Sequence, residues 1–153
     1  MEESKVKPLL ETLRITENYE KLLNDKELSD FVFICSDGQH IHVTMGVILI
    51  QCPSFALKFN QNESGWAEFD DIDSKTMLEL LRFIYCGKVE GLKYVDFDLL
   101  IAAHKYGMSD LKEVCVSSLM ETFPTVGFFK VLELADLMNL SDLKANIIDH
   151  IKW

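Results

Sequence analysis

One stretch, residues 30–59, limits the possible folds more than any other part of this sequence. Its first part has β-rich runs on both sides of Asp37-Gly38, a pair that favours the tight turn of a β-hairpin. The segment 45–51 follows directly and is apolar at nearly every position, which is typical of a buried element, although periodicity alone does not decide between helix and strand. Pro53 then stands where a further helical turn can begin. The stretch therefore predicts a hairpin that leads into a buried apolar segment.

The second half of the chain contains the same helix–turn–helix pattern twice. Residues 100–112 and 132–144 align in register, each with an apolar helix, a turn and a capped second helix. Gly107 and Asn139 are residue types that accept the left-handed conformation after a helix, and a serine two positions later can cap the next helix in both copies. Two copies in register are difficult to attribute to chance, so we expect stacked helical hairpins that share a core.

The segment before the hairpin predicts a short amphipathic helix. Thr16 has the side chain of an N-cap, and the mixed, charged residues 1–14 before it are expected to be partly mobile. A helix of about two turns is marginal by itself in water, so its apolar face must dock, either on the chain's own core or on a second molecule. That face consists of Ile15, Tyr19, Leu22 and Leu23.

The middle of the chain predicts a short strand followed by a helix with clear ends. Residues 66–69 are typical of an edge strand and follow a polar loop at 60–65. Asp73 is the expected N-cap of the helix, which continues through apolar residues until Gly87 ends it.

Charge and composition exclude several classes of function. The chain has 153 residues, which fits one globular domain. Its formal net charge is −10, and its sequence has no cluster of Lys and Arg such as a nucleic-acid-binding surface requires. No apolar run approaches the ~18 residues of a membrane span, and the first residues lack an apolar signal sequence. We therefore expect neither a nucleic acid nor a membrane as partner, and a location in the cytoplasm, the nucleus or both. The cysteines expected to be reduced are Cys35, Cys52, Cys86 and Cys115.

Candidate metal and catalytic residues are few, and structural roles explain them better. His40 and His42 would face the same side of a strand, but no third ligand stands at a suitable spacing. His104 lies on an apolar helix and is interpreted as a packed histidine at the core edge. The acidic group 70–73 lacks the glycine and terminal glutamate of a calcium loop. No nucleotide-binding or nucleophile motif occurs, so the sequence predicts a protein that is not an enzyme and binds no metal or cofactor.

Several of these segments together resemble the BTB/POZ domain. The matching runs are Ser29-Asp30-Phe31, Cys52-Pro53-Ser54-Phe55, Phe83-Ile84-Tyr85-Cys86-Gly87 and Ala103-His104-Lys105-Tyr106. The second hairpin, with Leu134-Ala135-Asp136-Leu137, is similar to the helical extension of speckle-type BTB proteins, whereas the family's usual His-Lys pair is replaced by Thr44-Met45. The resemblance implies an α+β fold with a small sheet flanked by helices. It places a BTB/POZ domain at 15–120 and a helical extension, similar to a 3-box or the start of a BACK region, at 121–153.

The resemblance also implies a homodimer. Its interface would consist of Ile15, Tyr19, Leu22, Leu23 and Val47. The residues alone leave open the alternative that the first helix packs on the chain's own core. In many BTB domains an aspartate at the position of Asp30 faces a basic residue at the position of Met45. With methionine there, we expect Asp30 to accept backbone N–H hydrogen bonds instead.

A further implication is an adaptor that docks a cullin-3 ubiquitin-ligase scaffold through a hydrophobic-x-Glu motif. Here only Trp66-Ala67-Glu68 has that pattern, nearer to the strand than in the family and after a shorter loop. Trp66 has a second interpretation, in which it folds onto Phe59 and Phe69 and fills the core. Two other functions stay open: a dimerisation module of a transcription regulator that recruits a co-repressor, and a purely structural homo-oligomerisation domain. The expected cullin-facing residues are Phe59, Asn62, Glu63, Trp66, Glu68, Tyr106 and Phe128.

Overall fold

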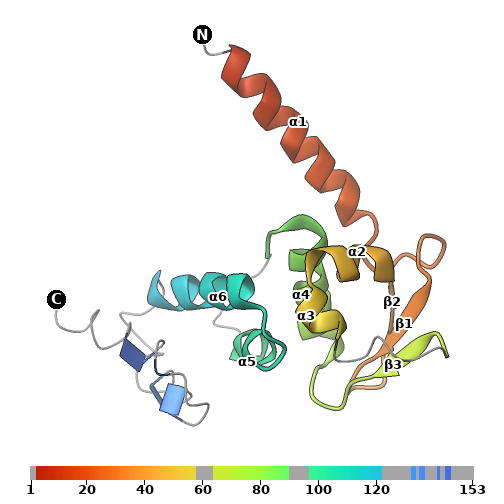
Figure 1. Ribbon diagram of the computed structural model, residues 1–153, viewed down its shortest axis with the longest axis vertical. Coiled ribbons are helices and arrows are strands. Elements are labelled where there is room, and N and C mark those ends of the chain that lie inside the picture. Colours follow the sequence, from red (N-terminus) through yellow and green to blue (C-terminus); the bar gives the residue numbers. More distant parts are fainter. Residues whose placement is uncertain are drawn as a thin grey trace.

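A small sheet covered by helices, with one long helix projecting from it, makes up the part of the chain that the structure describes (Figure 1). This computed structural model describes residues 3–57, 64–89, 97–121, 132–133, 135–136, 141 and 144–145. The predicted α+β class is confirmed. The elements in chain order are α1 (Glu3–Glu20), β1 (Phe31–Ile34), β2 (His40–Val43), α2 (Met45–Gln51), α3 (Pro53–Ala56), β3 (Trp66–Glu68), α4 (Ser74–Cys86), α5 (Phe97–Lys105) and α6 (Ser109–Glu121).

The sheet has three strands in the order β2-β1-β3. Strand β1 pairs with β2 in antiparallel and with β3 in parallel orientation. At the β1–β2 turn, the Cys35 N–H donates to the Gln39 carbonyl at 2.9 Å, and Gly38 adopts a φ of 80°, which side chains other than glycine rarely allow. The hairpin predicted around Asp37-Gly38 is therefore confirmed.

The apolar segment after the hairpin is a helix, α2, and only one side of it is covered. Ile48 is buried, whereas Leu49 and Ile50 expose 44% and 81% of their surface. The prediction that this segment is buried all round is wrong. A helix at the surface of the body can bury only the side that faces the core, so apolar residues on its other side remain open to solvent. Helix α3 begins at Pro53, as the position of the proline indicated.

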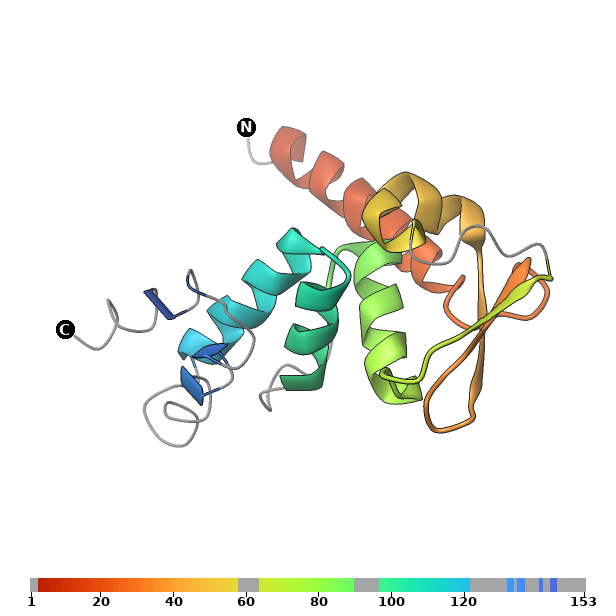
Figure 2. The same ribbon diagram turned by 60° about the horizontal axis from the view of Figure 1, so that its bottom comes forward.

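Helix α4 has the ends that the sequence predicted. The Asp73 side chain accepts a hydrogen bond of 2.8 Å from the Thr76 N–H, and Gly87 follows the helix in the left-handed conformation. The helix stands between the sheet and the α5–α6 pair (Figure 2). Its buried face consists of Thr76, Met77, Leu80, Leu81, Ile84 and Tyr85.

The core next to the sheet is built around four aromatic rings. Phe33 lies edge-on to Phe55 and Phe69, with centroid distances of 6.1 and 5.0 Å. The Phe55 and Phe69 rings are stacked at 6.0 Å, and Tyr106 meets Phe55 edge-on at 5.2 Å. Because Phe33 belongs to β1 and Tyr106 follows α5, this cluster joins the sheet to the helical half of the molecule. Pairs of this geometry stabilise beyond the area that they bury.

The turn between α5 and α6 has the predicted cap. Gly107 adopts a φ of 70°, and the Met108 N–H donates to the Ala103 carbonyl at 2.8 Å. Met108 is buried, as expected for the apolar contact that accompanies such a cap. The first of the two predicted helical hairpins is therefore confirmed.

Most of the second hairpin, including its turn at Asn139, lies outside the described residues. Among those that are described, Ala135 is buried and Leu132 packs against the core. Lys144 and Asp136 form an ion pair at 2.6 Å. The described residues of this region thus include apolar residues that belong to the common core.

Helix α1 is longer than the sequence indicated. It begins at Glu3, so the predicted start at Thr16 is wrong, and the segment 1–14 that was expected to be partly mobile is mostly helical. Pro8 lies inside the helix, where its fixed φ is compatible with helical geometry although its missing N–H removes one hydrogen bond. Thr16 was the misleading signal, because its hydroxyl suits a cap but the residue lies well within the helix.

Candidate protein-interaction surfaces

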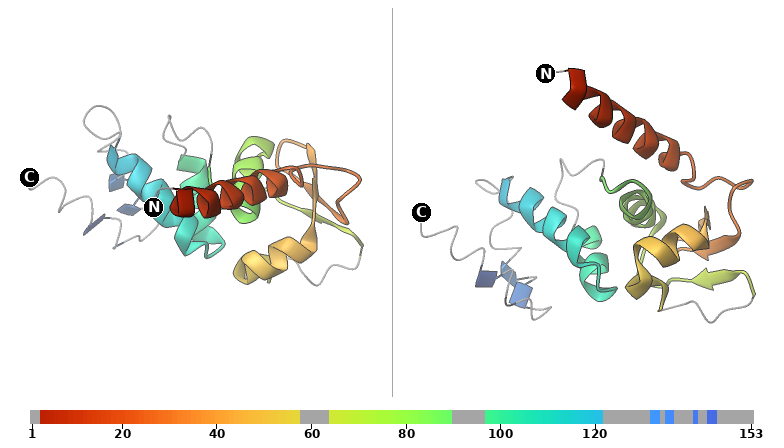
Figure 3. Two further views of the ribbon diagram at one scale, coloured as in Figure 1. Left: turned by 90° about the horizontal axis from the view of Figure 1, so that it is seen from above. Right: turned by 45° about the horizontal axis from the view of Figure 1, so that its top comes forward.

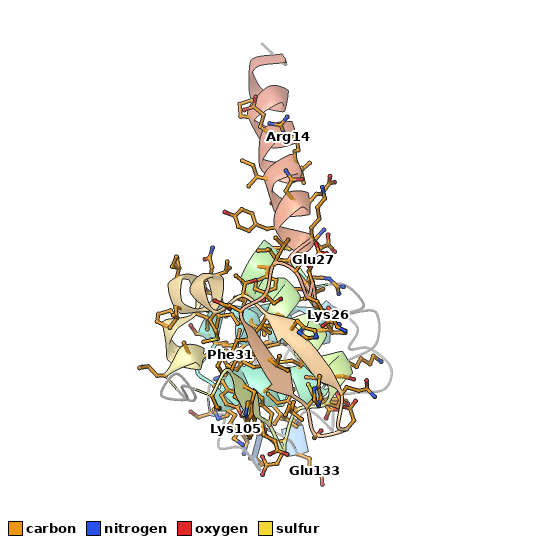
Figure 4. All side chains as sticks on the ribbon, turned by 90° about the vertical axis from the view of Figure 1, so that its right-hand side faces the viewer. Arg14, Lys26, Glu27, Phe31, Lys105 and Glu133 are labelled. Atoms are coloured by element: carbon orange, nitrogen blue, oxygen red, sulfur yellow. The ribbon has the colours of Figure 1, made fainter. Side chains whose placement is uncertain are left out.

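Helix α1 forms an arm that meets the body of the molecule, the sheet with helices α2–α6, near the arm's C-terminal end. Figures 1 and 3 show the arm standing away from the sheet and the other helices, and Figure 4 shows Arg14 on its projecting part. Ile15 and Tyr19 lie one turn apart on the arm and are 53% and 46% exposed, and Leu13 is 52% exposed on another side. Large apolar side chains gathered on a projecting helix mark a surface for interaction.

The five predicted dimer residues fall into two groups. Ile15 and Tyr19 are exposed on the arm. Leu22, Leu23 and Val47 are half-buried and pack against the core of their own chain. Within one chain, the residues after α1 and Val47 thus pack on their own core, whereas Ile15 and Tyr19 stay about half exposed, and the dimer interface itself stays a prediction.

A groove of about 560 Å³ lies between the arm and the body. Its walls come from α1, the α2–α3 junction, the end of α4 and the α5–α6 turn. The apolar part of the lining includes Ile15, Tyr19, Phe83 and Met108, and Asp110 contributes a negative charge. The volume lies within the range of sites that bind small molecules or a few side chains of a peptide.

Trp66 points away from the core. It is 45% exposed, whereas Ala67 and Phe69 are buried. The interpretation in which Trp66 fills the core is therefore wrong. The cause is the two-residue period of β3, since Ala67 and Phe69 face inward and leave Trp66 and Glu68 on the outward side. The Trp66-Ala67-Glu68 motif thus presents its hydrophobic residue and its glutamate to solvent.

The other residues of the predicted cullin-facing set are not all described. Phe59, Asn62, Glu63 and Phe128 lie outside the described residues. Tyr106 is only 8% exposed, because its ring packs in the aromatic cluster. The ring of Tyr106 is therefore part of the core, and the cullin-facing surface expected around this residue stays a prediction.

The Tyr106 hydroxyl reaches the edge of the core and donates to Asp71 at 3.2 Å. Lys105 forms an ion pair with the same carboxylate. Burial, together with the nearby charge of Asp71, raises the pKa of Tyr106, and the hydrogen bond to Asp71 raises the pKa of Lys105. The acidic group 70–73 therefore ties the loop after β3 to α5, and Asp73 caps α4.

Asp30 makes the contact that the sequence predicted. The Met45 N–H donates to its carboxylate at 2.9 Å, so the expectation of a backbone N–H partner is confirmed. Next to it, the Thr44 N–H donates to the Tyr85 hydroxyl at 3.1 Å. The first N–H groups of a helix lack partners within the helix, and these two bonds fasten the start of α2 to the segment before β1 and to α4.

The thiols and histidines of the described residues do not assemble into a reactive group. Within that part of the chain, no three His, Cys, Asp or Glu side chains are grouped to hold a metal ion. Burial raises the pKa of Cys35 to about 11, so this thiol stays protonated at neutral pH. Burial and the neighbouring Lys112 lower the pKa of His104, in keeping with a packed position at the core edge.

Two strongly exposed apolar residues escaped the sequence interpretation. Ile50 at the end of α2 is 81% exposed, and Leu57 directly after α3 is 71% exposed. The available signal was the unbroken apolar run itself, because residues that follow one another on a helix point in different directions and cannot all face one core. Together with Trp66 they add apolar area to the outside of the body.

No helix among the described residues has the length and apolar character needed to cross a membrane.

Comparison with known proteins identifies the fold. The solved structure of the BTB (Tramtrack and Bric a brac) domain of human Gigaxonin matches with a TM-score of 0.51 and 26% sequence identity, over 60% of this chain and 78% of that chain. The family model of the BTB/POZ domain matches residues 19–122, from the end of α1 through α6. The chain therefore belongs to the BTB/POZ family of protein–protein interaction domains.

Proposed function

We propose that this domain forms a homodimer through its N-terminal arm and serves as an adaptor that docks a cullin-3 ubiquitin-ligase scaffold. The observation that supports dimerisation is the apolar face of the arm, where Ile15 and Tyr19 are about half exposed. Helical stability in proteins comes mainly from packing of an apolar face. A second copy that covers this face would remove it from water and stabilise the arm at the same time.

A double variant, Ile15→Asp with Tyr19→Asp, tests the arm by size-exclusion chromatography with light scattering. We expect a dimeric wild-type chain and a monomeric variant, because burying two unpaired carboxylates costs several kcal/mol. Lys21→Glu is the control, since it changes the formal charge equally at an exposed neighbouring position and should stay dimeric. Leu22 is unsuitable for this test because it packs against its own core. A double variant that still dimerises would contradict the role of the arm.

The adaptor function is supported by the outward-facing Trp66 and Glu68, which present the hydrophobic-x-Glu pattern on β3. Tryptophan is a common anchor at protein interfaces. The similarity of Leu134-Ala135-Asp136-Leu137 to the extension of speckle-type proteins supports the same assignment. Calorimetric titration of this chain with the purified N-terminal region of cullin-3 should give a saturable isotherm. The absence of binding at the highest soluble concentration would refute the adaptor.

A dimerisation module of a transcription regulator is the second candidate, and the groove beside the arm favours it. The part of its lining that lies on the body, with Phe83, Met108 and Asp110, suits a short co-repressor segment with apolar side chains and a basic residue. Affinity purification from cells separates the two functions: capture of cullin-3 supports the adaptor, and capture of a co-repressor without cullin-3 supports the regulator. A dimer that captures neither would support a purely structural oligomerisation domain.

A further inference from the structure

Glu20 stands where a carboxylate is unfavourable for its own helix. It is the last residue of α1, and no basic residue occupies the last turn of that helix. The carbonyl groups at a helix C-terminus carry partial negative charge, so an acidic side chain there is repelled. The placement of Glu20 must therefore be explained by a contact outside α1.

That contact is a bridge to two cations at the end of α4. The Glu20 carboxylate lies 3.4 Å from Arg82 Nε through one oxygen and 3.3 Å from Lys88 Nζ through the other. Arg82 is oriented by Glu79, whose carboxylate lies 2.5 Å from Nη1. The side chains of Glu20 and Arg82 are 29% and 17% exposed, so water screens this pair less than it screens a pair on the open surface.

The bridge connects the C-terminal ends of two helices. Helix α4 ends at Cys86, directly before Gly87 and Lys88, and Figures 1 and 2 show the end of α1 next to this end of α4. Two helix C-termini carry charge of the same sign and repel one another when they are close. Arg82 and Lys88 offset both that repulsion and the charge of Glu20.

The segment after Glu20 and the ion pairs of Glu20 together hold the end of the arm on the body. Hydrogen-bonded turns continue from the helix, with the Leu22 N–H donating to the Tyr19 carbonyl and the Leu23 N–H to the Glu20 carbonyl, and Asn24 then adopts a φ of 54°. Leu22 and Leu23 pack against the core, but they lie beyond the end of the helix and anchor the turn. Glu20 forms an ion pair with Arg82 of α4 and a second one with Lys88, which follows that helix.

We propose that Glu20 is the positioning residue of the arm: its bridge to Arg82 and Lys88 sets the angle at which α1 leaves the body and so presents Ile15 and Tyr19 to a second copy. The inference rests on the proposed homodimer. Loss of the bridge leaves the apolar face intact but lets the arm sample other directions, so the dimer weakens through a lower population of the binding orientation.

Glu20→Gln in the full chain tests this, with Glu17→Gln as the matched control. Glu17 is exposed on the same helix, so its variant removes the same charge without touching the bridge. Hydrogen exchange of the α1 amides should accelerate in Glu20→Gln, and the dimer dissociation constant from sedimentation equilibrium should rise about fivefold, which is the effect of about 1 kcal/mol. Glu17→Gln should match the wild type in both. High salt should raise the dissociation constant of the wild-type dimer and leave that of Glu20→Gln almost unchanged. If Glu20 did not act on the dimer through its ion pairs, the two constants would respond to salt alike.

Lys88→Arg should retain the bridge, and Lys88→Gln should reproduce the exchange behaviour of Glu20→Gln. Unchanged α1 exchange in Glu20→Gln would overturn the positioning role. Faster exchange with an unchanged dissociation constant would overturn the link between arm angle and dimerisation. A wild-type chain that is monomeric at all concentrations would overturn the homodimer, while the exchange data would still decide whether Glu20 holds the arm.

Discussion

Replacing Trp66 by alanine tests the proposed cullin-3 surface, because its effect on the affinity for cullin-3 and its effect on the stability of the domain can be measured separately. A tryptophan side chain presents roughly 250 Å², so an exposed share of 45% corresponds to about 110 Å² that a partner can cover. At ~25 cal/mol per Å² this burial contributes at most about 3 kcal/mol. Because part of that energy is lost to ordering and desolvation, we expect a loss of about 2 kcal/mol, or roughly 30-fold in the dissociation constant.

The same substitution should lower the stability of the isolated domain only moderately. Truncation to alanine removes the contacts of the part of Trp66 that its own chain covers, and we expect a decrease of about 1–2 kcal/mol in the free energy of unfolding. A fully buried tryptophan would lose about 3–5 kcal/mol. Urea unfolding measures this quantity, and calorimetric titration with cullin-3 measures the affinity at a temperature where the variant is folded.

Leu28→Ala is the control for Trp66→Ala. Leu28 is an exposed apolar residue before β1, at 55% exposure, and lies outside the proposed surface. Its variant should bind cullin-3 with wild-type affinity. If Trp66→Ala bound within twofold of the wild type, Trp66 would not be an anchor and the outward hydrophobic-x-Glu motif would lose its role.

Three further predictions concern the fold. Phe55→Ala should lower the free energy of unfolding in urea by about 3–5 kcal/mol, because the fully buried ring meets three other aromatic rings. Gly107→Ala should lower the free energy of unfolding by about 1–2 kcal/mol, because alanine is unfavourable at a φ of 70°. The added Cβ would not clash, since it would lie 3.8 Å from Ser54, and an unchanged melting temperature would contradict this prediction. The hydrogen bond from Ser74 lowers the pKa of Asp37. The ionised Asp37 therefore stabilises the fold at pH values above the usual aspartate pKa, and this stabilisation is lost as the pH falls through the lowered pKa. Asp37→Asn should therefore make the acid side of the stability profile less steep in thermal melts.

Local chemistry was sufficient to predict the elements whose ends depend on a few neighbouring residues. The Asp37-Gly38 turn, the Asp73 cap and the glycine after α5 have backbone or side-chain requirements that few residue types meet. The backbone N–H partner of Asp30 was predicted in a different way, from the resemblance, because methionine stands at position 45 where many BTB domains have a basic residue. The turn and the caps can be predicted from single positions because each of those interactions is made within one turn of the chain.

Features that depend on distant parts of the chain were not predictable in this way. The sequence offers Met1 and Glu2 before Glu3, neither of which is a favoured N-cap type, and the misleading hydroxyl of Thr16 lies within the helix. Trp66 and Tyr106 are both large aromatic residues beside polar segments, yet Trp66 is exposed and Tyr106 is buried. The register of β3 determines which side Trp66 faces, and the packing of α5 determines the position of Tyr106. Ile50 shows the same limit, since an apolar residue type does not reveal which side of a short helix will be covered.

The molar mass of the wild-type chain in solution tests the central claim most directly. One chain has a mass of 17.6 kDa, so a homodimer has twice that, about 35 kDa. Light scattering at micromolar concentration should give the dimer mass at physiological salt, because the exposed apolar face of the arm is then covered by a second copy. A mass of 17.6 kDa that persists as the concentration is raised would contradict the account.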